Sequence, residues 1–181
     1  MVAIKGSRVL LRDFTHSDLD KMHGWMSDNE VMTFLPHRKT TVKDQTLVHL
    51  SESIQENFNP NRKLYFFAVV LGNGDIIGSA GFTVISRSET GGVANLGWVL
   101  AKDYWGKGYA TEAARLLIDY CFNILGFHKV IARCDAQNKA SERVMIRCGM
   151  IKEAEHKQHV YSNGTWRDRY EYAIFRDTEV I

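Results

Sequence analysis

Two glycines that flank a lysine, Gly106 and Gly108 in the stretch "YWGKGYATEA" (residues 104–113), are the first residues that could do chemistry. They follow a short apolar run and precede an alanine-rich segment with helical spacing. Glycines let a backbone turn tightly and let its N–H groups approach a ligand closely. The first N–H groups of a helix lack partners and lie at the positive end of the helix dipole. On the turn alone, a phosphate-binding turn and a purely structural turn are equal interpretations, because both need the same glycines.

Two side chains of this turn could strengthen such a site. Lys107 offers a positive charge and Thr111 a hydroxyl, although a solvated loop lysine is an equal interpretation of Lys107. A dinucleotide-binding fold is the competing interpretation. It needs a third glycine where this chain has Thr111, and an acidic residue after the next strand, for which Asp135 is the candidate. The turn lies past the middle of the chain, with room for about one further crossover unit, so this oxidoreductase interpretation is disfavoured.

The cysteines and the paired histidines do not point to redox or metal chemistry. The three cysteines are odd in number, lie more than ten residues apart and fall in apolar stretches: Cys121, Cys134 and Cys148. We therefore expect reduced core residues, and no sequence cue for an activating histidine marks them as acyl carriers. His156 and His159 have i, i+3 spacing, but no acidic or cysteine partner accompanies them at a metal-like spacing. No metal site is expected.

Composition sets broader limits on the class of protein. The 181 residues include 45% hydrophobic residues, which is enough for one domain with a sheet covered by helices. A formal net charge of +2 gives no support for a nucleic-acid partner or an anionic membrane. The longest apolar run, "LYFFAVVL" at residues 64–71, is too short to span a bilayer, and the N-terminus lacks a signal-peptide pattern. We expect a cytoplasmic protein.

Hydrophobic patterns predict the elements that must position these residues. Strands are expected at residues 8–14, 63–71, 76–86, 93–101, 128–135, about 153–161 and about 167–175, and helices at about 16–27, 42–58, 110–125 and 138–148. Residues 86–92 are interpreted as a polar loop, and residues 28–40 show no clear pattern. The order predicts an α+β fold with a crossover unit in its second half.

The second half of the chain resembles the GNAT superfamily of acyl-CoA-dependent N-acetyltransferases. The stretches "GWVLAKDYWGKGYATEAARLL" and "NKASERVMIRCGM" carry this resemblance. At the ends, "RVLLRDFTHSDLD" and "GTWRDRYEYAIF" look like the opening and final segments of the branch that includes the ribosomal-protein N-acetyltransferases RimJ and RimL. The resemblance implies one GNAT-like domain over residues 1–181, with a central mixed and splayed β-sheet of about seven strands flanked by about four helices.

In this family the turn and the strand before it bind coenzyme A. The resemblance implies that the turn holds the pyrophosphate and that the strand carries a bulge and splays from the next strand at Gly97 to Leu100. It also implies that Asn138 hydrogen-bonds the pantetheine arm. An uninterrupted strand and a helix N-cap are the structural alternatives. The residues expected to bind acetyl-CoA are Trp98, Val99, Leu100, Trp105, Gly106, Lys107, Gly108, Tyr109, Ala110, Thr111, Asn138 and Arg143.

The catalytic residues depart from the family pattern. Many relatives place a tyrosine general acid seven residues after the asparagine, where this chain has Met145. Many also carry a glutamate on the strand before the turn, where this chain has Asn95. Ser141 matches a serine of the RimL-like branch that is a candidate proton donor, against the alternative of a simple first-turn helix serine. Glu153 and Glu155 are the candidate bases on a later strand.

The resemblance therefore implies direct transfer of an acetyl group from acetyl-CoA to a primary amine, with strand amides near Val99 and Leu100 stabilising the oxyanion. At pH 7 a lysine amine costs roughly 4 to 5 kcal/mol to deprotonate, whereas an α-amine costs only about 1 kcal/mol. Without an obvious strong base, the preferred acceptor is a protein or peptide N-terminal α-amine. A polyamine or antibiotic acceptor and a non-catalytic CoA-binding module are the alternatives, and the protein is expected to be a monomer or a homodimer.

Overall fold

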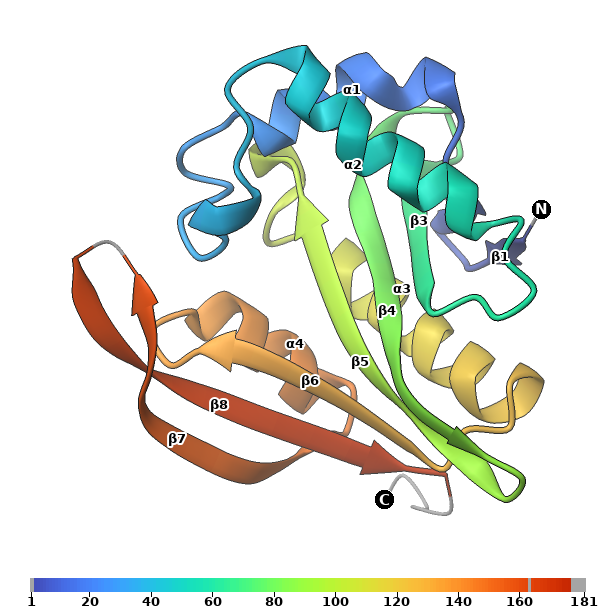
Figure 1. Ribbon diagram of the computed structural model, residues 1–181, viewed down its shortest axis with the longest axis vertical. Helices are drawn as coiled ribbons and strands as arrows, with labels where there is room; N and C mark the ends of the chain where they lie inside the picture. The colour runs from blue at the N-terminus through green and yellow to red at the C-terminus, as the bar shows by residue number, and fades with distance from the viewer. Residues whose placement is uncertain (1, 163, 177–181) are drawn as a thin grey trace.

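The computed structural model describes residues 2–162 and 164–176, in which eight strands form one sheet (Figure 1). The strand order is β1-β2-β3-β4-β5-β6-β8-β7, and all neighbours are antiparallel except β5 and β6. The strands are β1 Ala3–Lys5, β2 Val9–Asp13, β3 Leu64–Leu71, β4 Ile76–Ser88, β5 Gly91–Leu100, β6 Lys129–Asp135, β7 Ile151–Ser162 and β8 Thr165–Phe175. The helices are α1 Leu19–Met26, α2 Lys43–Glu56, α3 Tyr109–Asp119 and α4 Lys139–Arg147. The predicted mixed sheet flanked by four helices is confirmed.

Two details of the strand prediction were wrong. The sheet has eight strands rather than about seven, because β1 pairs with β2 although its three residues are too few to show an alternating pattern. Residues 86–92 are mostly strand rather than loop, since the β4–β5 ladder continues as far as Ser88 and Gly91. The side chains at this end of β4 are exposed, so polar residues are compatible with the backbone pairing that holds them.

Helices cover both faces of the sheet. On one face the core joins Phe67 and Phe82 of the sheet to Leu117 of α3 and the fully buried Met145 of α4. The other face packs against α1 and α2, with Leu50 of α2 among its fully buried side chains. β5 and β6 therefore lie near the middle of a sheet that has a helical layer on each face.

The sheet splays between its two parallel strands. β5 and β6 pair only from Val93 opposite Lys129 to Leu96 opposite Ala132, and the last four residues of β5 have no partner on that side. Figure 1 shows the two strands diverging beyond this point. Along β4, however, β5 keeps an unbroken register from Leu100 back to Ala94, so the implied bulge is not present there. The only shift in that ladder falls further on, between Val84 and Ser86.

The segments next to the splay complete the fold. The patternless residues 28–40 form turns and the short 3-10 helix η2, Pro36–Arg38, which lies between α1 and α2. The helix expected at residues 110–125 is α3 followed by a π-helical turn, Tyr120–Ile124, and the chain then turns at Gly126 with a φ of 68°. Figure 1 shows the segment before α2 on the same side of the molecule as the open end of β5.

Candidate active site

The predicted phosphate-binding turn joins β5 to α3. It follows the short 3-10 helix η3, Lys102–Tyr104, and both glycines have the left-handed backbone that favours glycine, with φ of 72° at Gly106 and 84° at Gly108. Gly108 is the N-cap of α3. The conformation of the turn therefore requires the glycines, and because they have no side chains, the backbone of the turn stays accessible to a ligand.

The start of α3 presents unpaired donors at this turn. The first helical hydrogen bond runs from the Glu112 N–H to the Gly108 carbonyl at 3.1 Å. The N–H groups of Tyr109, Ala110 and Thr111 therefore have no partner within the helix, and they lie at the positive end of its dipole. This arrangement can bind a phosphate group. Thr111 itself is buried, with 8% of its surface exposed.

An arginine that the sequence analysis did not identify holds the turn in place. Arg8, just before β2, donates from Nη1 to the Lys107 carbonyl at 2.9 Å and from Nε to Glu112 at 2.8 Å. Its guanidinium also lies 5.0 Å from the ring centre of Tyr109. Lys107 is exposed, with Nζ 5.6 Å from the ring centre of Tyr104. No local pattern marks Arg8, because its partners lie about a hundred residues away.

The open end of β5 offers backbone donors on its unpaired side. The Ala101 N–H donates to the Ile77 carbonyl on the β4 side, and alternate residues of a strand direct their N–H groups to the same side. The Val99 N–H therefore points toward β4, whereas the N–H groups of Trp98 and Leu100 point into the gap beside β6. The Leu100 carbonyl is already used, since it accepts from Trp105 Nε1 at 2.7 Å.

Across the gap, α4 begins with the expected polar pair. Asn138 is the N-cap, and its Oδ1 accepts from the Ser141 N–H at 3.0 Å. This bond leaves the Asn138 amide nitrogen able to donate elsewhere and leaves the Ser141 hydroxyl uncommitted in the described part of the chain. Arg143 is exposed on α4 and does not line the cleft described next.

A cleft of about 470 Å³ opens where β5 and β6 separate. Both Asn138 and Ser141 line it, together with Asn95 and Gly97 of β5. The remaining walls come from β3, β4, β6, α1, the segment before α2, α2 itself and the β7–β8 hairpin. Asn95 Oδ1 is buried without a hydrogen-bond partner, so a ligand N–H in the cleft would satisfy it.

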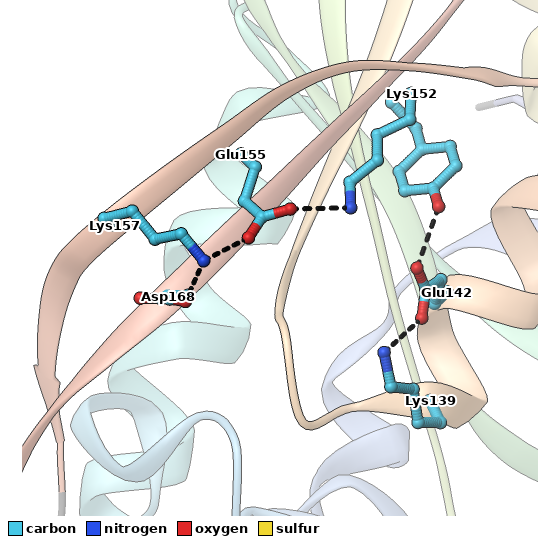
Figure 2. A network of polar contacts seen from close by, with 7 residues as sticks. Lys139, Glu142, Lys152, Glu155, Lys157 and Asp168 are labelled. Carbon is cyan, nitrogen blue, oxygen red and sulfur yellow. Dashed lines mark hydrogen bonds and ion pairs between the residues drawn. The ribbon is translucent and has the colours of Figure 1, made fainter.

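The two predicted bases do not lie in this cleft. Glu153 forms an ion pair with Lys129 at 2.5 Å, at the end of β6 remote from the splay. Glu155 bridges Lys152 and Lys157 on β7, and these hydrogen bonds lower its pKa (Figure 2). The structure thus brings Ser141 to the cleft but leaves both glutamates outside it, because β7 turns their side chains toward neighbouring lysines.

The titratable groups that do line the cleft come from segments without a local signal. The carboxylates among its lining residues are Glu52, Asp135 and Asp168, and the imidazoles are His37 and His49. Burial and the nearby charges of two arginines, Arg38 and Arg169, lower the pKa of His37. The His37 ring is therefore mainly neutral at pH 7 and can accept a proton.

The cysteines are unsuited to nucleophilic chemistry. All three are free and buried. Burial raises the pKa of Cys134 and of Cys148 to about 11 and also raises that of Cys121, so the thiolate form is scarce near pH 7. The described residues contain no cluster of histidine, cysteine or acidic side chains able to hold a metal ion. They also contain no helix that is both long and apolar enough to cross a membrane.

Comparisons with known proteins agree with this geometry. The family model "Acetyltransferase (GNAT) domain" matches residues 8–151. The uncharacterized N-acetyltransferase YnaD of Bacillus subtilis is 31% identical over 175 residues, which cover 96% of this chain and 97% of that protein. Two solved structures share the fold. A RimL ribosomal L7/L12 α-N-protein acetyltransferase in complex with coenzyme A has a TM-score of 0.85 and 20% identity, covering 98% of this chain and 100% of that one. A spermidine N-acetyltransferase of Vibrio cholerae in complex with CoA and spermine has a TM-score of 0.81 and 21% identity, covering 94% and 97%.

The splayed sheet, the glycine turn before α3 and the family match lead to the same conclusion. The chain belongs to the GNAT family and is an acetyl-CoA-dependent N-acetyltransferase.

Proposed function

We propose that the acceptor is the α-amine of a protein or peptide N-terminus. The observation that carries this proposal is the absence of a strong base beside the open end of β5, within the described residues. Asn95 occupies the strand position where many relatives have a glutamate, and Glu153 and Glu155 are paired with lysines elsewhere. An amine that loses its proton readily suits such a site.

The free energy of deprotonation separates the acceptor classes. An α-amine with a pKa of about 7.7 to 8.0 needs about 1 kcal/mol to become neutral at pH 7, whereas a lysine amine near 10.4 needs roughly 4 to 5 kcal/mol. Among the cleft residues, the neutral imidazole of His37 is a suitable weak base. Transfer to an imidazole whose pKa lies below 6.5 is a modest step from an α-amine and a steep one from lysine.

In the proposed reaction the neutral amine attacks the thioester carbon, so that a C–N bond forms and the C–S bond breaks. The Trp98 and Leu100 N–H groups can hydrogen-bond the donor chain and the developing oxyanion, while Asn138 donates to the pantetheine arm. Asn95 Oδ1 accepts a hydrogen bond from the attacking amine, and Ser141 donates a proton to the departing thiolate. The proton that the nitrogen loses as the amide forms returns to Ser141 through solvent. The turn from Trp105 to Thr111, with Lys107 at its centre, binds the pyrophosphate. Arg143, which is exposed outside the cleft, contacts a coenzyme phosphate farther from the reacting atoms.

The second candidate is a polyamine acceptor, since one structure with this fold is a spermidine N-acetyltransferase. A polyamine is a multiple cation, and cleft residues with unpaired positive charge, Arg38 and Arg169, oppose it. A non-catalytic CoA-binding module would bind acetyl-CoA but release no thiol with any acceptor.

An acceptor screen that follows thiol release tests the proposal. It compares peptides with free and blocked N-termini, lysine peptides with blocked N-termini, polyamines and aminoglycosides. We expect efficient turnover with free-terminus peptides and little with the blocked ones. Turnover of a blocked lysine peptide while the free-terminus peptide stays inert would overturn the proposal and would require a stronger base than the cleft contains.

A further inference from the structure

Two arginines face the cleft without a carboxylate partner in the described residues. Arg169 of β8 is half-buried, and burial together with the nearby Arg133 lowers its pKa, against smaller opposite effects of Cys134 and of Glu171, which is paired with Arg133. Arg38 lies in η2 on another wall, with its guanidinium 5.5 Å from the ring centre of Phe66. Both residues line the cleft, and no ion pair is formed by either within the described ranges 2–162 and 164–176.

The other strong charges of the cleft are mostly neutralised within the protein. Arg133 pairs with Glu171 of β8. Asp135 lies 3.4 Å from Arg167, and Asp168 lies 2.9 Å from Lys157 (Figure 2). The remaining carboxylate is Glu52 of α2, whose nearest ionisable partner is His49 at 3.8 Å and whose side chain is 62% exposed. Among the described residues of the cleft, two guanidinium groups therefore lack an ion-pair partner, and the carboxylate of Glu52 is well solvated.

The face of the sheet on which Arg169 lies connects it to the acceptor side. Cys134 of β6 and Tyr172 of β8 belong to the core under α4, so the alternate residues Asp135 and Arg169, which are paired across the two strands, point to the opposite face. That face is the one over which η2 and α2 stand. Arg169 is therefore on the acceptor side of the splay, where Asn95 also has its unpartnered oxygen.

An unpaired guanidinium that is partly removed from water raises the free energy of the folded protein unless a ligand forms hydrogen bonds with it. Its planar fork matches a carboxylate with two parallel hydrogen bonds, and such charge-assisted bonds are among the stronger ones in proteins. The cleft volume of about 470 Å³ is typical of a pocket for a small ligand, so the matching anion must lie close to the reacting amine.

We propose that the acceptor is an acidic N-terminus, with an aspartate or glutamate within its first few residues whose carboxylate binds Arg169, assisted by Arg38. This inference rests on the proposed function, because it assumes an α-amine acceptor. A lysine or arginine near the amine would instead face two guanidinium groups, so the same pair of arginines selects against basic N-termini.

The test uses the full-length protein and free-terminus peptides that are identical except for glutamate, glutamine or lysine at the second residue, with a parallel set at the third. In at least one set kcat/KM falls about tenfold to a hundredfold from glutamate to glutamine, the effect of losing a charged hydrogen bond, and falls further with lysine. Arg169→Gln removes most of this preference, Arg169→Glu reverses it, and Arg38→Gln weakens it by a smaller factor. Arg169→Lys retains part of it.

Arg176→Gln is the matched control, since Arg176 follows β8, is exposed and does not line the cleft. It makes the same charge change and leaves the preference intact. Replacing Arg169 leaves no charged partner among the described residues without its ion pair, so we expect its variants to stay folded. The melting temperature and the calorimetric acetyl-CoA affinity of each variant check this, and both should be unchanged.

The outcomes separate the two proposals. Equal kcat/KM for the three peptides in both sets overturns the charge inference while α-amine transfer stands, and so does a glutamate preference that survives in the Arg38→Gln, Arg169→Gln double variant. If every free-terminus peptide is inert while a polyamine is acetylated, the α-amine proposal fails and the inference fails with it.

Discussion

The proposed acetyl-CoA side and the proposed acceptor side of this molecule differ in the kind of group that each presents. The first consists of backbone: two glycines with positive φ, the unpaired amides at the start of α3 and the open end of β5. The second consists of side chains from η2, α2, β6 and the β7–β8 hairpin, which are far apart in the sequence. Backbone can be shared by every enzyme that uses the same donor, whereas side chains can change with the acceptor.

This difference explains why the donor side keeps a recognisable local pattern while the acceptor side does not. A left-handed turn before a helix has few solutions, and glycine is the usual one. A cleft wall only has to present some charge or shape, and many residue types and positions can do so. Substitutions on the donor side should therefore affect every acceptor equally, whereas those on the acceptor side should change the ranking of acceptors.

The largest effect is expected at the turn. Gly108 has a φ of 84°, where a β-branched residue is strained by roughly 1 to 3 kcal/mol, and a side chain there would also crowd a bound pyrophosphate. Gly108→Val should lower acetyl-CoA affinity by about a hundredfold, measured by calorimetry on the folded variant, for a combined loss of about 2.7 kcal/mol.

The matched control is Gly74→Val in the β3–β4 turn, where φ is 88° and no atom lies within 4 Å of the added Cβ. This variant carries a similar backbone strain far from the cleft, so its melting temperature should fall while its acetyl-CoA affinity stays unchanged. If Gly108→Val binds acetyl-CoA as the wild type does, the turn has only a structural role.

The next effect concerns the step that the two sides share, departure of the thiolate. Ser141→Ala should lower kcat by about tenfold to a hundredfold with little change in acetyl-CoA affinity, because a thiol with a pKa near 8.5 is already a tolerable leaving group. The helix cap survives, since it uses the Ser141 backbone N–H. Ser53→Ala is the control, because Ser53 lines the cleft but donates its hydroxyl to the His49 carbonyl. Wild-type turnover of Ser141→Ala across pH would assign the proton to water.

Local patterns in the sequence allowed most strands, the four helices, the turn and the Asn138 cap to be predicted, because each depends on neighbours within a few residues, whereas the splayed sheet came from the family resemblance. It did not reveal Arg8 on the turn or Arg169 in the cleft, whose places depend on contacts across the fold. Glu153 was a reasonable candidate as an acid on a late strand. Only the pairing of β7 with β8 and the ion pair with Lys129 show that it lies away from the splay.

A smaller, pH-dependent effect is expected on the acceptor side. Since burial and the charges of Arg38 and Arg169 lower the pKa of His37, its ring is neutral and able to accept a proton from about pH 6.5 upward. His37→Gln should lower kcat/KM for a free-terminus peptide by about tenfold near pH 7, the cost of deprotonating an α-amine without help. The two enzymes should converge above about pH 8, where the amine is already neutral. A pH-independent ratio would show that His37 does not remove this proton.

The smallest effect separates the two roles of Asn138, which stands at the border of the two sides. Aspartate caps a helix as well as asparagine does, so Asn138→Asp keeps the bond from the Ser141 N–H but loses the amide hydrogens. Loss of one hydrogen bond, about 0.5 to 1.5 kcal/mol, should lower acetyl-CoA affinity by about twofold to tenfold without lowering the melting temperature. Asn138→Ala should lose that affinity and, in addition, about 1 kcal/mol of stability. Unchanged affinity in Asn138→Asp would mean that the residue acts only as a cap and that the donor side is bound by backbone alone.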